Sequence, residues 1–408
     1  MREVASDVRR WFDEGRAVAL AQVTKTWGSS PRVPGSVMAV ADDGRLAGSV
    51  SGGCIEGAVA QVAMECAGSR LSSLEKFHAS TRRAQEVGLS CGGNIEVFVG
   101  DLPRALFAVE EALIRADAAY ARVTAVEAVF PGDRVDDPSQ DDAAVREGGM
   151  DALGAMAIVA DEEALTAAVA SLAPAVAAEV AVARCDGAAV ATAGEADCLL
   201  AVAEAVAARP ASEDAGHVIE GGIDWFFARV RPAPQLVCIG GVHIAMRLAE
   251  IAHVMGFRTV VVDPRRVFAT GERFPGVDEL VHAWPQEAFA EDGPVRLTAN
   301  TAVCALTHDP KIDVPALQAA LASPAFYIGS LGRSTTQLSR CRQLAGEGCP
   351  DEQIARIYGP IGLDLRGREP AEIALSIMAE ICAVRHGSPY ELSTMLETAR
   401  GLEGGEAA

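Results

Sequence analysis

Hydrophobic and polar positions alternate in short runs near the start of the chain, which is the pattern of half-buried strands. Residues 17–26 (AVALAQVTKT) predict one strand. Residues 36–40 and 45–51 predict two more, joined through Asp42-Asp43-Gly44, a strong hairpin-turn signal. A helix is expected over 54–68 and a further strand over 94–99. Residues 1–102 are therefore expected to form a mixed α+β domain.

A different pattern begins after Pro232-Ala233-Pro234, where short apolar runs alternate with amphipathic segments. The runs predict strands at 235–239, 259–263, 279–283, 302–307 and 325–330, and helices at 243–256, 313–322, 333–346 and 370–386. Apolar strands that alternate with helices indicate a doubly wound parallel sheet. The fold class is thus α/β, with a Rossmann-like domain over 232–390. A tail follows over 391–408, and we expect its end, after Leu402, to be disordered.

The middle segment, residues 103–231, is rich in alanine and valine and carries few motifs. A helix is expected at its start, and strands at 180–192 and 217–231. Residues 122–130 (RVTAVEAVF) faintly resemble residues 16–24 (RAVALAQVT). The segment therefore either completes the first domain or is a degenerate repeat of it.

Composition limits the partners of the chain. Its 35 basic and 56 acidic side chains give a formal charge of −21, which argues against nucleic acid or an anionic membrane surface as a partner. No run of about 18 apolar residues is present, so we expect no membrane span. Residues 1–16 have the charges of an amphipathic helix rather than of a signal peptide. The ten cysteines include no C-x-x-C pair, a pattern typical of reduced thiols in a cytoplasmic protein.

Two cysteines lie in glycine-rich turns, Ser51-Gly52-Gly53-Cys54-Ile55-Glu56 and Ser90-Cys91-Gly92-Gly93. Glycine lets the backbone turn sharply and approach a ligand closely. Cys54 is expected in the first turn of a helix, where the pKa of a thiol is lowered, and Glu56 suits the dipole of that helix. If Cys54 and Cys91 converge, they could bind a transition metal, a sulfur atom in transit or a thiolated cofactor. The alternative is two small buried residues in tight turns.

The second half of the chain carries the pattern of a dinucleotide-binding site. A predicted strand leads into Gly240-Gly241-Val242-His243, then a helix, then a second strand that ends at Asp263. Val242 stands where the second glycine of the motif allows the backbone to approach a pyrophosphate. His243 is expected to contact a ligand or to cap its helix. Arg265 is expected to bind a phosphate or to form a salt bridge with Asp263.

Two later strand ends carry further candidates at the same predicted edge. His308 and Asp309 are expected to contact substrate, or Asp309 to orient His308 as a general base; the alternative is that Asp309 caps the following helix. Gly329, Gly332 and Arg333 form a candidate phosphate cradle.

Several long segments resemble the XdhC/CoxI family. GSSPRVPGSVMAV, GSVSGGCIEGAV and SCGGNIEVFVG are similar to its N-terminal domain; VHIAMRLAEIAHVMGFRTVVVDPR, ALTHDPKID, AFYIGSLGR and GPIGLDLRGREPAEIALSIMAEICAVRHG are similar to its Rossmann domain. The resemblance covers residues 15–101 and 233–387. Members commonly read GAGHV where this chain has Gly240-Gly241-Val242-His243-Ile244, and GSRR where it has Gly332-Arg333-Ser334-Thr335.

The resemblance implies an accessory protein for molybdenum hydroxylases such as xanthine dehydrogenase and CO dehydrogenase. Such proteins bind molybdenum cofactor, help it to acquire sulfur from a cysteine desulfurase and deliver it to the apo-enzyme. It implies that Cys54 and Cys91 handle the cofactor, its metal or its sulfur, together with the flanking Gly52, Gly53, Gly92 and Gly93, and that the chain is a homodimer. The alternative is an NAD(P)-dependent oxidoreductase acting on a small organic substrate through Asp263, His308 and Asp309.

Overall fold

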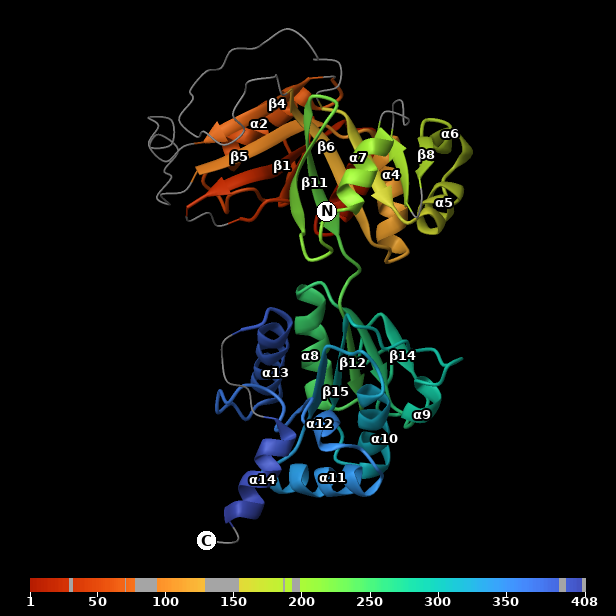
Figure 1. The fold of residues 1–408 in the computed structure, drawn as a ribbon, viewed down its shortest axis with the longest axis vertical. Coiled ribbons are helices and arrows are strands. Elements are labelled where there is room, and N and C mark those ends of the chain that lie inside the picture. The colour runs from red at the N-terminus through yellow and green to blue at the C-terminus, as the bar shows by residue number, and fades with distance from the viewer. Residues whose placement is uncertain are drawn as a thin grey trace. The chain divides into compact units, whose positions relative to one another are not determined.

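The chain forms two compact units, residues 1–232 and residues 233–408. The computed structural model (Figure 1) describes residues 1–28, 32–69, 71–77, 94–128, 154–185, 188–192, 199–388 and 394–405. Within those ranges, every helix is too short or too polar to cross a membrane.

The first unit begins with an antiparallel sheet of order β3-β2-β1-β5-β4. It confirms the strands expected at 17–26 and 94–99 and the hairpin around residues 42–44. The elements are α1 (Ala5–Asp13), β1 (Val18–Trp27), β2 (Val37–Ala41), β3 (Leu46–Gly48), α2 (Glu56–Cys66), β4 (Ser72–Phe77) and β5 (Asn94–Asp101).

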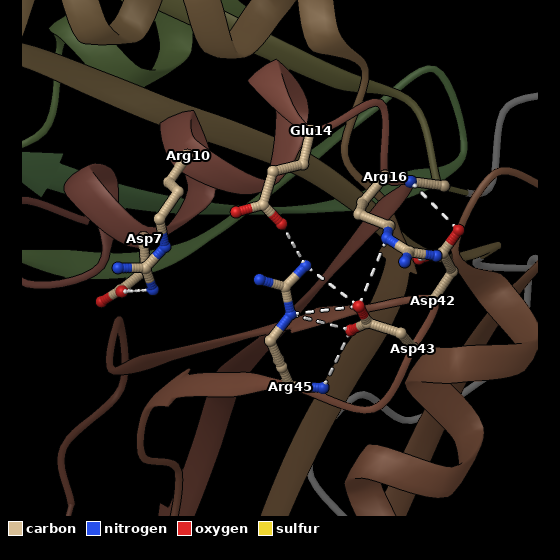
Figure 2. Close-up of polar contacts among 8 residues, drawn as sticks. Asp7, Arg10, Glu14, Arg16, Asp42, Asp43 and Arg45 are labelled. Carbon is tan, nitrogen blue, oxygen red and sulfur yellow. Dashed lines mark hydrogen bonds and ion pairs between the residues drawn. The ribbon is translucent and has the colours of Figure 1, made fainter.

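Arg45 fixes the β2–β3 turn to the end of α1, as Figure 2 shows. Its Nε donates to Asp43 Oδ1 at 3.1 Å, and its Nη2 donates to Glu14 Oε2 at 2.6 Å. The Arg45 guanidinium also lies 5.7 Å from the ring centre of Trp11, a buried residue of α1. Arg16 adds a further ion pair, 3.3 Å from Asp43. The charged surface of α1 thus holds the hairpin that the Asp-Asp-Gly turn predicts.

A second antiparallel sheet follows in the same unit, of order β10-β11-β6-β7-β9-β8. The strands expected at 180–192 and 217–231 form hairpins, the second of which turns at Gly221 and Gly222 with φ of 61° and 75°. The elements are α4 (Arg104–Arg115), β6 (Tyr120–Ala128), β7 (Met156–Ala160), α5 (Glu162–Ala170), α6 (Pro174–Ala177), β8 (Ala181–Cys185), β9 (Ala188–Thr192), α7 (Leu200–Ala207), β10 (Ala215–Glu220) and β11 (Ile223–Val230).

The two sheets share one plan. In each, the first strand (β1 or β6) lies between its successor (β2 or β7) and the last strand of its set (β5 or β11). In each, the first strand carries one bulged residue against the last, Thr24 in β1 and Val126 in β6. Helix α2 packs on one sheet and α7 on the other, while residues from both sheets share the cluster between them. This correspondence supports the interpretation of residues 103–231 as a degenerate repeat, which stays a prediction.

The second unit confirms the parallel sheet, of order β14-β13-β12-β15-β16-β17. This is the strand order of dinucleotide-binding folds. In β12, Leu236 and Cys238 pack in one cluster with residues of α8 and α13, and Val237 and Ile239 pack in another with residues of α10, α11 and α14. The elements are β12 (Gln235–Ile239), α8 (His243–Val254), β13 (Arg258–Val262), β14 (Glu279–Val281), α9 (Pro285–Ala288), β15 (Thr301–Ala305), α10 (Pro310–Leu321), β16 (Tyr327–Ser330), α11 (Ser334–Gly346), α12 (Asp351–Ile354), β17 (Ile357–Tyr358), α13 (Pro370–Arg385) and α14 (Met395–Gly405).

The last helix, α14, extends from Met395 to Gly405. Met395 and Ala399 are buried and anchor it to the core of the second unit. The disorder expected at the end of the chain stays a prediction.

Candidate functional site

In the first unit, the carboxylate of Glu56 closes the glycine-rich loop upon itself. Glu56 Oε1 accepts hydrogen bonds from the amides of Ser51 and Gly52 at 2.8 and 3.0 Å, and from the Ser49 hydroxyl at 2.7 Å. Oε2 accepts from the Ser51 hydroxyl at 2.6 Å and from the Gly53 amide at 2.8 Å. Five donors from one loop thus converge on one side chain.

These hydrogen bonds set the charge of Glu56. Burial by itself would raise its pKa, but the donors from Ser49 and Ser51 outweigh burial and lower the pKa to about 2. Glu56 is therefore ionised at neutral pH, and its charge is satisfied inside the loop. The structure shows Glu56 as the residue that shapes this loop; the role in cofactor binding expected for it stays a prediction.

Cys54 lies in this loop, two residues before the first residue of α2. Helix α2 begins at Glu56 with Ile55 as its N-cap, so the expectation that Cys54 stands in the first helical turn is wrong by two residues. The reason is the Ser51 hydroxyl, which accepts from the amides of Cys54 and Ile55, both at 3.1 Å, and delays the start of the helix.

Cys54 is partly exposed. Its thiol is free and half-buried, and it packs against the apolar cluster under α2. Gly52 and Gly53 are exposed with φ of 82° and 115°, a region that favours glycine. A Cβ placed on Gly53 or Gly57 would meet no atom within 4 Å. Exposed glycine backbone therefore lies on both sides of Cys54 in the sequence.

The second cysteine turn cannot be compared with this one. Cys91, Gly92 and Gly93 lie outside the described residues. Convergence of Cys54 and Cys91 on a metal thus stays a prediction. In the parts of the chain that the structure describes, no three His, Cys, Asp or Glu side chains cluster closely enough to bind a metal ion.

In the second unit, the carboxyl ends of β12 and β15 meet at the point where the strand order reverses, the usual ligand crevice of such folds. Gly240, with φ of 104°, follows β12, and a Cβ there would collide with the Thr307 side chain after β15. A Cβ on Gly241 would collide with the Phe268 carbonyl group, 2.7 Å from its carbon. Both glycines are thus required for loop packing, whatever ligand binds.

The acidic residue after β13 is fully buried. Asp263 Oδ2 accepts from the Gly241 amide at 2.8 Å and from Arg265 Nη2 at 2.8 Å, and Oδ1 accepts from Arg265 Nε at 2.9 Å. Burial would raise the pKa of Asp263, but these hydrogen bonds keep it below its usual value. Arg265 thus forms the salt bridge that the sequence left as an alternative to phosphate binding.

The neighbouring motif residues take different positions. His243 is the exposed first residue of α8, and Val242 is the N-cap, which makes no side-chain cap hydrogen bond. The side chain of Val242 packs against the cluster beneath α8 and α13. Asp309 accepts from the Lys311 amide at 2.9 Å and caps α10, the structural alternative stated for it, while His308 is exposed. Their proposed part in catalysis stays a prediction.

The candidate phosphate cradle is more closed at one end than at the other. A Cβ on Gly329 would meet Ile361 and lie 2.7 Å from the Tyr327 hydroxyl, so Gly329 serves packing beneath the edge. Gly332, with φ of 143°, and the exposed Arg333 form the turn that leads into α11. Only these last two residues lie where a ligand could reach them.

A buried ion pair that was not among the predicted site residues lies beneath this edge. Arg340 of α11 pairs with Asp313 of α10, and both are nearly fully buried. Arg340 also donates to Ser330 Oγ at 2.8 Å and to the Thr307 carbonyl at 3.2 Å. Asp313 accepts from Thr307 Oγ1 at 2.5 Å. The pair therefore fixes the loops after β15 and β16 to each other.

A signal for this pair was present. The buried face of α11 consists of Gln337, Arg340, Cys341 and Leu344, the i, i+3, i+4, i+7 spacing of a core-facing stripe. A charged residue within such a stripe requires a buried partner.

Family models match both ends of the chain. One described as "XdhC Rossmann domain" matches residues 236–381, and one described as "XdhC and CoxI family" matches residues 11–78. A crystal structure of a xanthine dehydrogenase from Bacillus halodurans has the same fold, with a TM-score of 0.67 over 94% of this chain and 96% of that chain, at 20% identity.

Three curated relatives share shorter segments. "Uncharacterized protein YqeB" of Escherichia coli is 30% identical over 182 residues, 45% of this chain and 33% of its own length. A probable subunit of xanthine dehydrogenase from Bacillus subtilis is 30% identical over 160 residues, 39% of this chain and 46% of its own length. "Molybdenum cofactor insertion chaperone PaoD" of Escherichia coli is 33% identical over 99 residues, 24% of this chain and 31% of its own length. The matches thus span a third to a half of these relatives. With its N-terminal and Rossmann domains both matched in order, the chain belongs to the XdhC and CoxI family.

Proposed function

We propose that this chain is an accessory protein that binds molybdenum cofactor, supports its sulfuration and delivers it to a molybdenum hydroxylase of the xanthine dehydrogenase or CO dehydrogenase type. The observation that carries the proposal is the loop at residues 49–56, which presents the free thiol of Cys54 beside exposed glycines. The names of two relatives, a probable subunit of xanthine dehydrogenase and a molybdenum cofactor insertion chaperone, agree with it.

The donor set suits such a cargo. A thiolate is a soft ligand that binds molybdenum or carries a sulfur atom, whereas the carboxylate beside it is already satisfied by the loop. Glu56 thus acts as a positioning residue: it fixes the backbone that orients Cys54. When bound, the cargo brings its molybdenum, to which a terminal sulfur is added. Cys54 and Cys91 are the groups proposed to contact the metal or its sulfur.

The proposal includes two protein partners. A cysteine desulfurase supplies the sulfur, and the apo-enzyme receives the finished cofactor. Assembly as a homodimer and a location in the cytoplasm belong to the same proposal. The net charge of −21 supports recognition of the partners by specific patches, since it disfavours nonspecific binding to polyanions.

The second candidate function is that of an NAD(P)-dependent oxidoreductase. It is favoured by the strand order of the second unit and by the glycine turn after β12. Burial of Asp263 and the capping role of Asp309 argue against it, because both carboxylates are bonded to the protein. The loop of Cys54 has no part in hydride transfer.

The test is an anaerobic titration of the whole protein with molybdenum cofactor, in which bound pterin and bound molybdenum are both measured. We expect stoichiometric binding that is lost in Cys54→Ala or Cys91→Ala. Cys349→Ala, which removes a half-buried thiol of the second unit, is the matched control. Absence of binding at micromolar concentration in the wild-type protein would overturn the proposal. Hydride transfer that survives both cysteine substitutions and is lost in Asp263→Ala would establish the second candidate.

A further inference from the structure

Two arginines share one aromatic ring in the loop that follows β13. The guanidinium carbon of Arg265 lies 4.3 Å from the ring centre of Phe268, and that of Arg273 lies 5.7 Å from the same centre. The ring itself is partly exposed, at 36% of its surface. Stacking on the ring holds both planar cations in place, and a planar guanidinium matches the oxygens of a phosphate.

The charges of the two arginines are not equally balanced. Arg265 uses Nε and Nη2 on Asp263, which leaves its Nη1 without a bond to any described residue. Arg273 makes no ion pair with the described part of the chain, and its Nη2 lies 3.7 Å from the sulfur of Met246 in α8. The arrangement favours an anionic ligand.

The position of Arg265 and Arg273 in the fold limits the kind of anion that can bind there. The loop packs directly on the turn after β12, where the Phe268 carbonyl touches Gly241. In dinucleotide-binding folds this is where the ribose of the adenosine half lies; a free carboxylate there accepts from its 2′-hydroxyl, and an arginine there binds a 2′-phosphate instead. Here the carboxylate of Asp263 is fully buried and bonded, and Arg265 and Arg273 are partly exposed.

Nearby acidic groups do not cancel the site. Asp309 and Asp313 are the other carboxylates whose charges act on Arg265. Asp309 caps α10 and Asp313 is paired with Arg340. Asp263 is satisfied by three donors besides the Arg265 amide. None of the three carboxylates lacks a partner of its own.

We propose that Arg265 and Arg273, stacked on Phe268, form a binding site for a phosphomonoester, such as the 2′-phosphate of an NADP-type nucleotide or the terminal phosphate of a pterin cofactor. The dianion takes donors from both guanidinium edges, and a nucleotide without that phosphate finds no carboxylate to accept from its ribose. The site is independent of the thiol chemistry proposed for Cys54, so either proposal can fail while the other holds.

The experiment is calorimetric titration of the full-length protein with NADP⁺, NAD⁺, 2′,5′-ADP, 5′-AMP and inorganic phosphate, and separately with molybdenum cofactor. We expect NADP⁺ and 2′,5′-ADP to bind at least about tenfold more tightly than NAD⁺ and 5′-AMP. Tighter binding of molybdenum cofactor that also depends on Arg273 would identify the pterin as the source of the phosphate.

The variants separate binding from folding. Arg265 is the counter-ion of a buried carboxylate, so Arg273→Gln is the first choice, and we expect it to weaken the phosphorylated ligands about tenfold while NAD⁺ is unaffected. Arg385→Gln is the matched control, because the Arg385 guanidinium also lies over a phenylalanine ring, 5.5 Å from the ring centre of Phe257. Phe257 precedes β13, whereas Phe268 follows it. Two results would overturn the proposal. One is that the wild-type protein binds no phosphate ligand. The other is that it binds NADP⁺ and NAD⁺ with equal affinity while Arg273→Gln leaves the binding of molybdenum cofactor unchanged.

Discussion

The carboxylate of Glu56 accepts a hydrogen bond of 2.8 Å from the amide of Gly53, a residue whose φ of 115° suits glycine alone. Gly53 sets the backbone conformation immediately before Cys54, and Glu56, at the start of α2, holds that conformation in place. Replacing Glu56 by Gln removes the charge and one acceptor oxygen from a loop in which five donors require acceptors.

We expect Glu56→Gln to reduce the stability of the loop by about 1–3 kcal/mol, the range for hydrogen bonds to a charged group. The measurement is amide hydrogen exchange in peptides that cover residues 49–56. Glu65→Gln is the control, because Glu65 is an exposed residue of the same helix. Equal protection of the loop in the two variants would show that the carboxylate does not hold it.

The same residue gives a stability that depends on pH. The pKa of Glu56 is lowered from its usual value of 4.5 to about 2 in the folded protein, so its contribution is present above about pH 4.5 and is lost as the pH falls toward 2. The difference in exchange between wild type and Glu56→Gln should therefore be constant near neutrality and shrink across this window. A difference that stays constant down to pH 2 would contradict the assignment.

Cys54 should react with thiol reagents faster than Cys66, the other cysteine of the first unit whose burial is known. Cys66, by contrast, is buried, and burial raises the pKa of its thiol. In the second unit, burial raises the pKa of Cys238 to about 12, so almost no thiolate forms there at neutral pH. Peptide mapping after brief treatment with iodoacetamide should show alkylation of Cys54 well before Cys66, Cys238 or Cys304. Alkylation of Cys66 at the rate of Cys54 would contradict the loop geometry.

The glycine turn after β12 tests the packing of the candidate nucleotide crevice. Gly241→Ala places a Cβ against the backbone of Phe268, 2.7 Å from its carbonyl carbon, and backbone cannot yield as a flexible side chain can. We expect a loss of about 1–3 kcal/mol, typical of overpacking. Gly271→Ala, in the neighbouring loop, meets no atom within 4 Å and should change stability little. Equal melting temperatures for the two variants would show that the loops separate readily.

Much of the second unit could be predicted because each strand is a continuous apolar run between turn residues. The runs at 235–239 and 302–307 became β12 and β15 with ends shifted by two residues at most. What could not be predicted was the state of Asp263. The pattern places an acid after β13, but whether it faces a ligand depends on Arg265, two residues later, and on the Gly241 amide.

The first unit was harder because its sheets are antiparallel and its repeats have diverged. When residues 122–130 are aligned with residues 16–24 by sequence, Phe130 is equivalent to Thr24. The bulges of β1 and β6 instead make Val126 equivalent to Thr24. A bulge is a local irregularity that leaves no fixed residue type, so its place cannot be found from a single sequence. The hydrogen bonds to Glu56 could not be predicted for a similar reason. Three of the five donors are backbone amides, which every residue type except proline provides.

The pair of Arg340 and Asp313 offers a further test, because it fixes the two loops that border the crevice. Removal of one partner from a buried ion pair leaves an uncompensated charge, so Arg340→Leu should cost about 3–5 kcal/mol in the stability of α11. Burial raises the pKa of Asp313 to about 6, against its usual 3.8, although Arg340 lowers it. The folded state thus retains a proton between about pH 3.8 and 6 that the unfolded state has lost, and stability falls as the pH rises through this range.

Asp313→Asn removes this titration while it keeps the shape of the side chain, so its stability should no longer fall between pH 3.8 and 6. The measurement is hydrogen exchange in peptides of α10 and α11, for both single variants and for the double variant. The double variant should lose less than the sum of the two single losses, since each single change leaves one buried charge alone. Additive losses would mean that the two residues act separately, Asp313 through its hydrogen bond from Thr307 and Arg340 through its hydrogen bond to Ser330.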